Sequence, residues 1–95
     1  MTIQHRQSGS KGAFLLNEED EPVGELVYSL THNNQMMIEH TKVDEDLRGA
    51  NFGYELVHKA VDYARLHKYT IIPLCSFARA VLEKKPEFKD VLAAL

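Results

Sequence analysis

The sequence predicts an α+β fold: a mostly antiparallel sheet with a βαβ C-terminal half and two main helices. Residues 3–43 hold four short apolar or alternating segments separated by turn residues, which is typical of antiparallel strands joined by hairpins. From Phe52 onward the apolar residues recur every three or four positions. This helical period is followed by a short apolar strand and then by a second helix, which gives the βαβ half.

The first four predicted strands cover residues 3–7, 13–16, 23–31 and 35–43. The turns between them are rich in Gly, Asn and acidic residues, and His32-Asn33-Asn34 is a hairpin signal. Regular alternation in the fourth strand predicts two faces. One face carries Met36, Ile38, His40 and Lys42, and the other carries Met37, Glu39, Thr41 and Val43.

The C-terminal half begins with an amphipathic helix over residues 52–67, whose charged residues lie mostly on one side. Residues 69–74 form a short buried strand, in which Pro73 indicates a position where a ladder hydrogen bond is spared. Ser76 is a candidate N-cap for a second helix over residues 77–84, which Pro86 ends. Residues 87–95 add a last helical turn or two.

Composition restricts the classes of protein. The 95 residues suffice for a single domain, residues 1–95, and the net charge of −3 argues against sequence-independent binding of nucleic acid. No apolar run has membrane-spanning length, so we expect no membrane partner. The single cysteine favours a reducing, cytoplasmic compartment, and the five histidines show no metal-ligand spacing, so no metal site is predicted.

The junction from Val43 to Gly53 is the most informative segment. It reads as a strand end, an acidic turn and a small-residue loop that opens the long helix. Free backbone N–H groups and the positive end of the helix dipole would converge there, which favours binding of an anion such as a phosphate. Gly49 permits close backbone approach, and Asn51 suits a left-handed conformation. The alternative is an ordinary loop-to-helix connection without a ligand.

The same eleven residues, Val43-Asp44-Glu45-Asp46-Leu47-Arg48-Gly49-Ala50-Asn51-Phe52-Gly53, resemble the acetyl-CoA-binding motif of the GNAT superfamily of N-acetyltransferases. That motif runs Val-x-Pro-x-x-Arg-Gly-x-Gly-x-Gly; here Glu45 replaces the proline and Asn51 the middle glycine. The resemblance implies a GNAT-like fold. It implies that backbone N–H groups hold the pyrophosphate of CoA, and the residues concerned are Arg48, Gly49, Ala50, Asn51, Phe52, Gly53 and Tyr54.

The resemblance also implies that the strand around Thr41 and Val43 pairs with the pantetheine arm and orients the acetyl carbonyl. We expect Ser76, Phe77 and Arg79, near the start of the last helix, to contact the coenzyme as well. Arg79, Lys84 and Lys85 are candidates for its 3′-phosphate, although a solvated helix face is the alternative for most of them.

The chain departs from the usual family pattern in two ways. It is short and lacks the helical segment that normally helps to form the acceptor site, so it looks like a minimal, single-domain GNAT-like branch, with Pro73–Ala78 and Lys85–Phe88 as further marks. Typical relatives carry a tyrosine in the last helix as general acid, but the corresponding residue here is Leu82, which cannot donate a proton.

Cys75 is the candidate nucleophile. It follows the last strand and precedes a helix N-terminus, whose dipole favours the thiolate, so it could accept the acetyl group before an amine does. His40 is the candidate base, provided that it faces the same side of the sheet as Cys75, and Glu39 is held in reserve. The alternatives are a buried structural thiol and a sheet-face histidine.

These observations predict an acetyl-CoA-dependent N-acetyltransferase that acts on an unknown amine of a small molecule or protein, with transfer through a cysteine as a candidate route. A competing hypothesis is a non-catalytic module that binds or senses CoA or acyl-CoA. A structural adaptor without a ligand is the third. We expect a monomer or a weak dimer.

Overall fold

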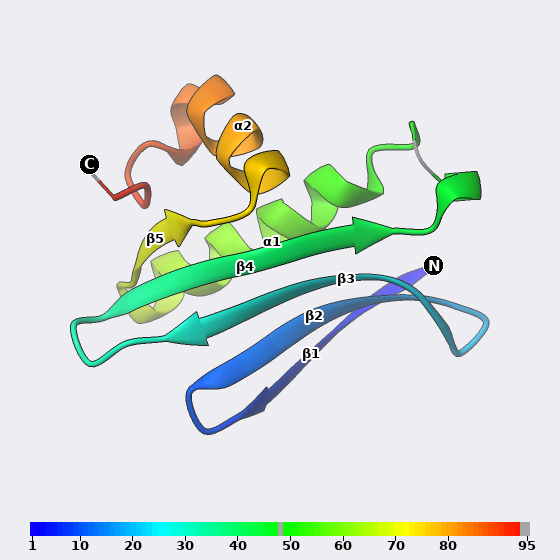
Figure 1. Cartoon of the computed structure of the whole chain (residues 1–95), viewed down its shortest axis with the longest axis horizontal. Helices are drawn as coiled ribbons and strands as arrows, with labels where there is room; N and C mark the ends of the chain where they lie inside the picture. The colour runs from blue at the N-terminus through cyan, green and yellow to red at the C-terminus, as the bar shows by residue number, and fades with distance from the viewer. Residues whose placement is uncertain (48, 94–95) are drawn as a thin grey trace.

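The computed structural model describes residues 1–47 and 49–93 (Figure 1). The predicted α+β order of elements is confirmed. The elements are β1 (Thr2–Ser8), β2 (Lys11–Glu18), β3 (Glu21–Leu30), β4 (Gln35–Val43), the 3₁₀ turn η1 (Glu45–Leu47), α1 (Phe52–His67), β5 (Thr70–Pro73), α2 (Ser76–Lys84) and the 3₁₀ turn η2 (Pro86–Phe88).

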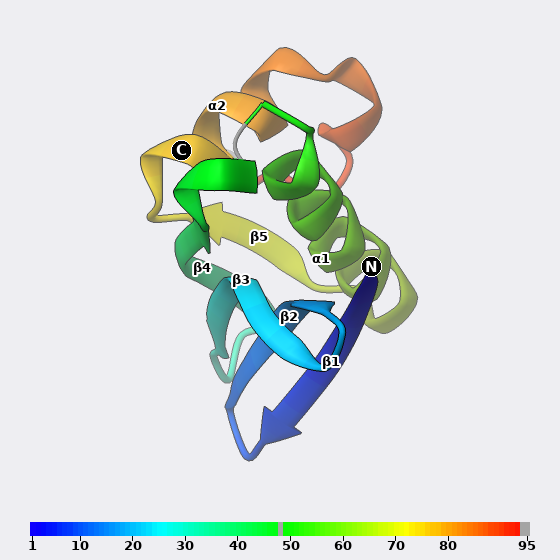
Figure 2. The same ribbon diagram turned by 90° about the vertical axis from the view of Figure 1, so that its right-hand side faces the viewer.

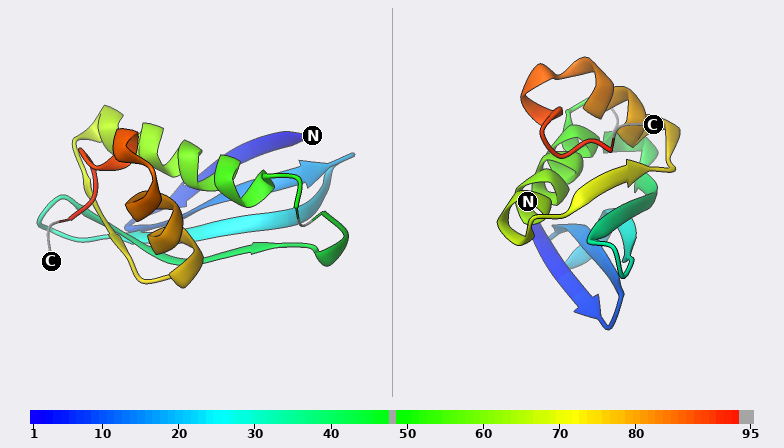
Figure 3. Two further views of the ribbon diagram at one scale, coloured as in Figure 1. Left: turned by 90° about the horizontal axis from the view of Figure 1, so that it is seen from above. Right: turned by 90° about the vertical axis from the view of Figure 1, so that its left-hand side faces the viewer.

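The five strands form one sheet in chain order, β1-β2-β3-β4-β5. The first four pair antiparallel, and β5 pairs parallel to β4 after the crossover through α1. Figures 1 and 2 show α1 lying across one face of the sheet, with α2 above the β4–β5 edge. Seen from above, the opposite face of β2 and β3 carries no helix in the described part of the chain (Figure 3).

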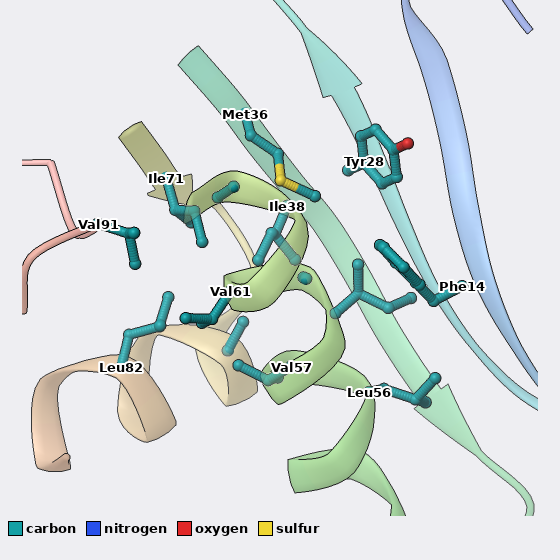
Figure 4. Packing of buried hydrophobic residues seen from close by; sticks show 14 of the residues in the cluster. Phe14, Tyr28, Met36, Ile38, Leu56, Val57, Val61, Ile71, Leu82 and Val91 are labelled. Carbon is teal, nitrogen blue, oxygen red and sulfur yellow. The ribbon is translucent and has the colours of Figure 1, made fainter. Parts of the chain in front are cut away.

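The core lies between α1 and the sheet. The apolar period of α1 buries Leu56, Val57, Ala60, Val61 and Ala64 completely, because residues three and four apart share one face of a helix. Figure 4 shows Leu56, Val57 and Val61 of this face directed toward apolar residues of the strands and of α2. The strand and α2 contributions include Phe14, Tyr28, Met36, Ile38, Ile71 and Leu82.

Gly12 of β2 is required by the close approach of a core side chain. A Cβ at Gly12 would lie 2.3 Å from the Tyr28 ring. Tyr28 is fully buried, and its hydroxyl is 2.5 Å from His5 Nε2, so the ring cannot move aside. The absence of a side chain at Gly12 therefore lets the Tyr28 ring of β3 lie across β2 and reach His5 of β1.

The C-terminal segment differs from the helical turns predicted for residues 87–95. Of residues 86–93, which the structure describes, η2 alone is helical, and after it the chain runs beside β5 with a short parallel bridge between Ile71 and Leu92. The Ile71 amide donates to Val91 O at 2.6 Å, and the Ala93 amide donates to Ile71 O at 2.9 Å. The prediction failed because these hydrogen bonds join residues distant in sequence, which a local helical pattern does not reveal.

A β-bulge in β4 positions the site. The β3–β4 register shifts between Val27 and Tyr28: Tyr28 lies opposite Ile38, but Val27 lies opposite His40. One additional residue, Glu39, is thereby inserted into β4, and every side chain after it changes face relative to a regular strand.

Candidate functional site

The site begins where β4 and β5 separate. Their parallel pairing ends at Ile38 and Pro73, and the amides of Leu74 and Cys75 both donate to the Ile38 carbonyl, at 3.0 and 3.2 Å. The chain then turns into α2, whereas β4 continues to Val43. The second half of β4 is therefore paired to β3 on one edge and, among residues 1–47 and 49–93, has no strand on the other.

The free edge presents the backbone groups of Thr41 and Val43. The Asp44 amide donates to Val23 O at 2.9 Å while Val43 lies opposite Gly24. In an antiparallel ladder this combination makes Val43–Gly24 a pair that exchanges no hydrogen bonds, and the next such pair is Thr41–Leu26. The N–H and C=O groups of Thr41 and Val43 consequently point away from β3, toward the opening.

A groove of about 880 Å³ extends from this edge to the start of α1. It is bounded by the end of β4, the loop before α1, the first turn of α1 and one side of α2. The lining residues are Thr41, Lys42, Val43, Leu47, Gly49, Asn51, Phe52, Gly53, Tyr54, Phe77, Val81, Lys84 and Lys85.

The start of α1 supplies free amides to this groove. Asn51 adopts the predicted left-handed conformation, with φ 64°, and its side chain makes no capping hydrogen bond. The first hydrogen bond of the helix runs from the Glu55 amide to Asn51 O, at 3.0 Å. The amides of Phe52, Gly53 and Tyr54 precede it and have no acceptor within the helix, which makes them available to an anion.

Gly53 also lets α2 approach α1. A Cβ at Gly53 would lie 2.8 Å from the ring of Phe77, which is 43% exposed. A larger residue at this position would push the Phe77 ring outward into the groove. Gly49, with φ 90°, has no atom within 4 Å of its notional Cβ, so it is required by its backbone conformation instead.

Cys75 is the N-cap residue of α2 and is partly buried beside the core. Burial raises the pKa of its thiol, but the nearby Ala78 amide, Thr41 hydroxyl, Phe77 amide and Thr41 amide oppose this by stabilising the thiolate, and the net pKa lies below the ordinary value. A larger share of the thiolate than in a free cysteine follows, and amides at a helix start act in this direction.

The Thr41 hydroxyl is the one buried polar side-chain atom without a hydrogen-bond partner of normal geometry among the described residues. It lies on the α1 side of the sheet, opposite the buried Leu26, and lines the groove. An unpaired buried hydroxyl is costly, and a ligand in the groove or a Cys75 thiolate would satisfy it.

Comparison with known proteins agrees with this architecture. A model of the GCN5-related N-acetyl-transferase family matches residues 13–91. The chain belongs to the GCN5-related N-acetyltransferase family. It is therefore an acetyltransferase by class, and acetyl-CoA is the co-substrate that this family uses. No curated protein matches the chain in sequence.

Solved structures of acetyltransferases share the fold. A GCN5-like candidate N-acetyltransferase from Staphylococcus aureus is 33% identical, with a TM-score of 0.74, over 97% of this chain and 89% of that one. A candidate streptothricin acetyltransferase from Bacillus anthracis, solved with acetyl coenzyme A, is 21% identical over 70% of this chain and 38% of that one, with a TM-score of 0.61. The ribosomal-protein-alanine N-acetyltransferase of Brucella melitensis is 17% identical over 90% of this chain and 66% of that one, with a TM-score of 0.67.

In this member of the family, most of the predicted coenzyme-binding residues do lie together. The groove is lined by Thr41, Val43, Gly49, Asn51, Phe52, Gly53, Tyr54 and Phe77. Ala50, Ser76 and Arg79 are exposed and do not line it, although Arg79 donates to Pro73 O at 3.5 Å. The prediction for Arg48 lies outside the described residues.

His40 is not brought to Cys75. Because of the bulge, His40 lies opposite Val27 on the face away from α1, where its Nε2 is 2.6 Å from Glu25 Oε2. Cys75 lies near Thr41, which is on the α1 face. The two predicted faces of β4 were therefore wrong beyond Glu39, and the sheet separates His40 from the thiol.

Glu39, the reserve base, is on the outer face with His40. It accepts hydrogen bonds from the Ser29 hydroxyl at 2.8 Å and from Lys11 Nζ at 3.2 Å. The Ser29 hydrogen bond lowers its pKa, partial burial opposes that, and Lys11 adds to the lowering. Glu39 is held as a carboxylate by these partners.

Three groove residues were not predicted as coenzyme ligands, namely Lys42, Leu47 and Val81. Lys84 and Lys85, which also line the groove, were candidates for the 3′-phosphate. Phe77, Val81, Lys84 and Lys85 follow the i, i+4, i+7, i+8 spacing of one helix face, so Val81 could have been found by extending the face that carries Phe77. Leu47 belongs to η1, for which the sequence has no periodic signal.

Two further predictions concern absences. Among residues 1–47 and 49–93, no three His, Cys, Asp or Glu side chains gather in a way that could hold a metal ion. Within the same ranges, none of the helices combines the length and the apolar character needed to cross a bilayer.

Proposed function

We propose that this protein transfers an acetyl group from acetyl-CoA, bound in the groove, to an amine acceptor. The amides of Phe52, Gly53 and Tyr54 hold the diphosphate at the start of α1. The free edge of β4 pairs with the amide groups of the pantetheine arm, as an added strand would. The observation that carries the proposal is that this edge and these amides open into one groove.

In this arrangement the thioester lies where β4 and β5 separate, beside Cys75. The Cys75 thiolate attacks the acetyl carbonyl, the bond between the carbonyl carbon and sulfur of CoA breaks, and CoA leaves as a thiolate that takes a proton from water. The amine then attacks the acetyl-cysteine. The new C–N bond forms, the bond to Cys75 Sγ breaks, and the amine releases its proton to water.

The route through Cys75 is supported by the residue at the position of the usual general acid. Leu82 is fully buried in the core and has no proton to donate, so this position cannot assist departure of CoA. When the Cys75 thiolate displaces CoA, the attacking and leaving groups are both thiolates of similar basicity, so the departure of CoA needs less assistance from a proton donor. Displacement of CoA by a neutral amine needs more of this assistance. His40 has no part in activating Cys75.

The competing proposal is a CoA-binding or acyl-CoA-sensing module without turnover, and the buried Leu82 favours it as well. Incubation with acetyl-CoA labelled in the acetyl group separates the two. Label on Cys75 that passes to an added amine supports the transferase. Binding without label on any residue or amine supports the module.

The acceptor in our proposal is an amine of a small molecule or protein, and we place the protein in the cytoplasm.

The site is tested by a substitution at Gly53. Gly53→Leu should weaken binding of acetyl-CoA by about tenfold or more, since the side chain displaces Phe77 into the groove and crowds the amides. The control is Ala80→Leu, an exposed position of α2 that does not line the groove. Calorimetric titration measures both variants. Equal affinity of the wild type and the Gly53→Leu variant would remove the assignment.

A further inference from the structure

β1 is held to the rest of the protein by few side chains. It pairs along its full length with β2, and with no other strand among the described residues. Ile3 is partly buried against the core, and the other residues of the strand are exposed. Alternation along β1 directs Ile3, His5 and Gln7 to the α1 face. An edge strand with so little buried area opens more readily than the strands at the centre of a sheet.

His5, in the middle of β1, contacts aromatic rings from three other elements. Its ring stacks on Phe14 of β2 with the centroids 4.3 Å apart, and it makes an edge-on contact with Tyr63 of α1 at 4.6 Å. Its Nε2 is 2.5 Å from the hydroxyl of Tyr28 of β3. Beside it, the Tyr63 hydroxyl donates to Gln7 Oε1 at 2.6 Å. His5 therefore joins β1 to β2, β3 and α1 at one point.

The Tyr28 hydroxyl is satisfied by a neutral His5. Tyr28 is fully buried; burial raises the pKa of its hydroxyl, and the neighbouring Tyr63 adds to the rise. Tyr28 therefore stays a donor, and a neutral imidazole nitrogen accepts its hydrogen bond. When His5 is protonated, both ring nitrogens carry a hydrogen, so Nε2 no longer accepts. The buried hydroxyl then loses its acceptor, which destabilises the closed strand.

The surroundings of His5 also oppose its charge. The titratable groups around it are Tyr28 from β3 and Tyr63 and His67 from α1. β2 contributes an apolar ring, and Arg6 of β1 points to the opposite face of the sheet. Burial lowers the pKa of His5, and His67 lowers it further. The closed strand thus binds fewer protons at this site than a detached one, so its stability falls as the pH drops below about 6.5, the ordinary pKa of a histidine.

We infer that His5 is a pH-sensitive switch, which holds β1 closed at neutral pH and releases the strand in mild acid. Release leaves the edge of β2 without a partner, and such an edge can accept a strand from another chain. The coenzyme groove lies at the start of α1, whereas Tyr63 and His67 belong to the end of that helix. The switch is therefore independent of the proposed function.

Hydrogen exchange of single amides, followed by NMR at pH 7 and pH 5, tests the switch. After correction for intrinsic exchange, the protection of the β1–β2 ladder should fall about threefold to tenfold on acidification. The β3–β4 ladder is the internal reference and should keep its protection. The ring signals of His5, titrated in the same samples, should give a pKa below the ordinary histidine value. Equal loss in both ladders, or a pKa of His5 at or above the ordinary value, would overturn the switch.

Two variants separate His5 from a general effect of acid. In His5→Gln the side chain still offers an oxygen to Tyr28 but does not titrate, so the β1–β2 ladder should be equally protected at both pH values. His32→Gln is the matched control, since His32 is exposed in the turn between β3 and β4. It should respond to acid as the wild type does. A response that persists in His5→Gln, or one that is lost in His32→Gln, would contradict the inference and leave the proposed function intact.

Discussion

The two halves of β4 have different environments, and the difference explains why the site lies where it does. In the first half, Met36 and Ile38 are fully buried between α1 and the sheet, and the strand is paired on both edges. In the second half, one edge has no strand and the Thr41 hydroxyl has no normal partner within the described residues. The first half provides rigidity, and the second half leaves polar groups unsatisfied at a fixed position.

The comparison shows how a small chain can hold both a core and a ligand groove. A domain of this size buries a limited apolar core, so little stability can be given up. Here the unsatisfied groups begin immediately after the last parallel pair, Ile38 with Pro73. The anchored half of the same strand therefore positions the open half without a separate scaffold.

The largest expected effect comes from breaking the packed half. Ile38→Ala should lower the free energy of unfolding by about 2–5 kcal/mol, because it leaves a cavity among fully buried side chains. Urea denaturation followed by circular dichroism measures the change. Thr41→Val is the matched comparison in the open half and should change stability by less than about 1 kcal/mol. Equal destabilisation by both would contradict the division of β4.

Turning the open half of β4 over should abolish it as a site. Insertion of one alanine between His40 and Thr41 shifts each following residue by one position against β3, so Thr41 and Val43 turn to the outer face while Ile38 stays in the core. Affinity for acetyl-CoA should fall by more than about tenfold, as measured by calorimetry on folded protein. Glu39→Ala adds no residue and should bind nearly as well as the wild type. Strong binding after the insertion would show that these faces do not matter.

A smaller effect is expected for the reactivity of Cys75. The pKa of Cys75 is below its ordinary value. Burial raises this pKa, but a set of nearby groups that includes the Ala78 amide and the Thr41 hydroxyl lowers it by more. In Thr41→Val the pKa should rise, and alkylation by iodoacetamide at pH 7 should slow about threefold to tenfold, since one hydrogen bond to a charged group is lost. Thr41→Ser should restore the rate. An unchanged pH profile in Thr41→Val would mean that the hydroxyl does not act on the thiol.

The smallest expected effect lies away from β4 and calibrates the others. The Arg65 guanidinium forms two hydrogen bonds to Asp90, of 2.9 and 2.8 Å, and holds the pKa of Asp90 below its ordinary value, while desolvation opposes this. A carboxyl group whose pKa is lower in the folded than in the unfolded protein stabilises the fold at pH values above its unfolded-state pKa. This stabilisation is lost as the pH falls through its folded-state pKa.

Asp90→Asn should accordingly lower the melting temperature slightly at pH 7. The difference from the wild type should disappear in acid, where Asp90 is protonated in both folded and unfolded protein. Calorimetric scans at several pH values give this difference directly. A difference that persisted at the lowest pH would mean that packing, and not charge, is responsible.

The helical and hairpin parts of the fold could be predicted because their signals are local. The three- and four-residue spacing of Leu56, Val57, Ala60, Val61 and Ala64 identifies the buried side of α1 without any tertiary information. The left-handed Asn51 was likewise predicted from residue type, and its φ of 64° confirms it. The family motif lies in this locally determined segment.

The face of each residue beyond Glu39 could not be predicted, because the bulge has no local signal. Glu39 is neither a glycine nor a turn residue, and the register shift becomes visible only once Tyr28 is paired with Ile38 and Val27 with His40. This single residue reversed the predicted faces of His40 and Thr41. The C-terminal bridge to Ile71 was missed for the same reason, since its partners are far apart in sequence.

The bridge between Ile71 and Leu92 also limits how copies of this protein could join. The backbone groups of Ile71 that would face a new neighbour are already used by Val91 and Ala93, and Pro73 has no N–H to offer. At the other end of the sheet, β1 pairs with β2 and with no other strand among the described residues. When the coenzyme occupies the free edge of β4 as proposed, a continuous sheet across two copies would be joined through β1, which leaves the two grooves at opposite ends and both open to the solvent.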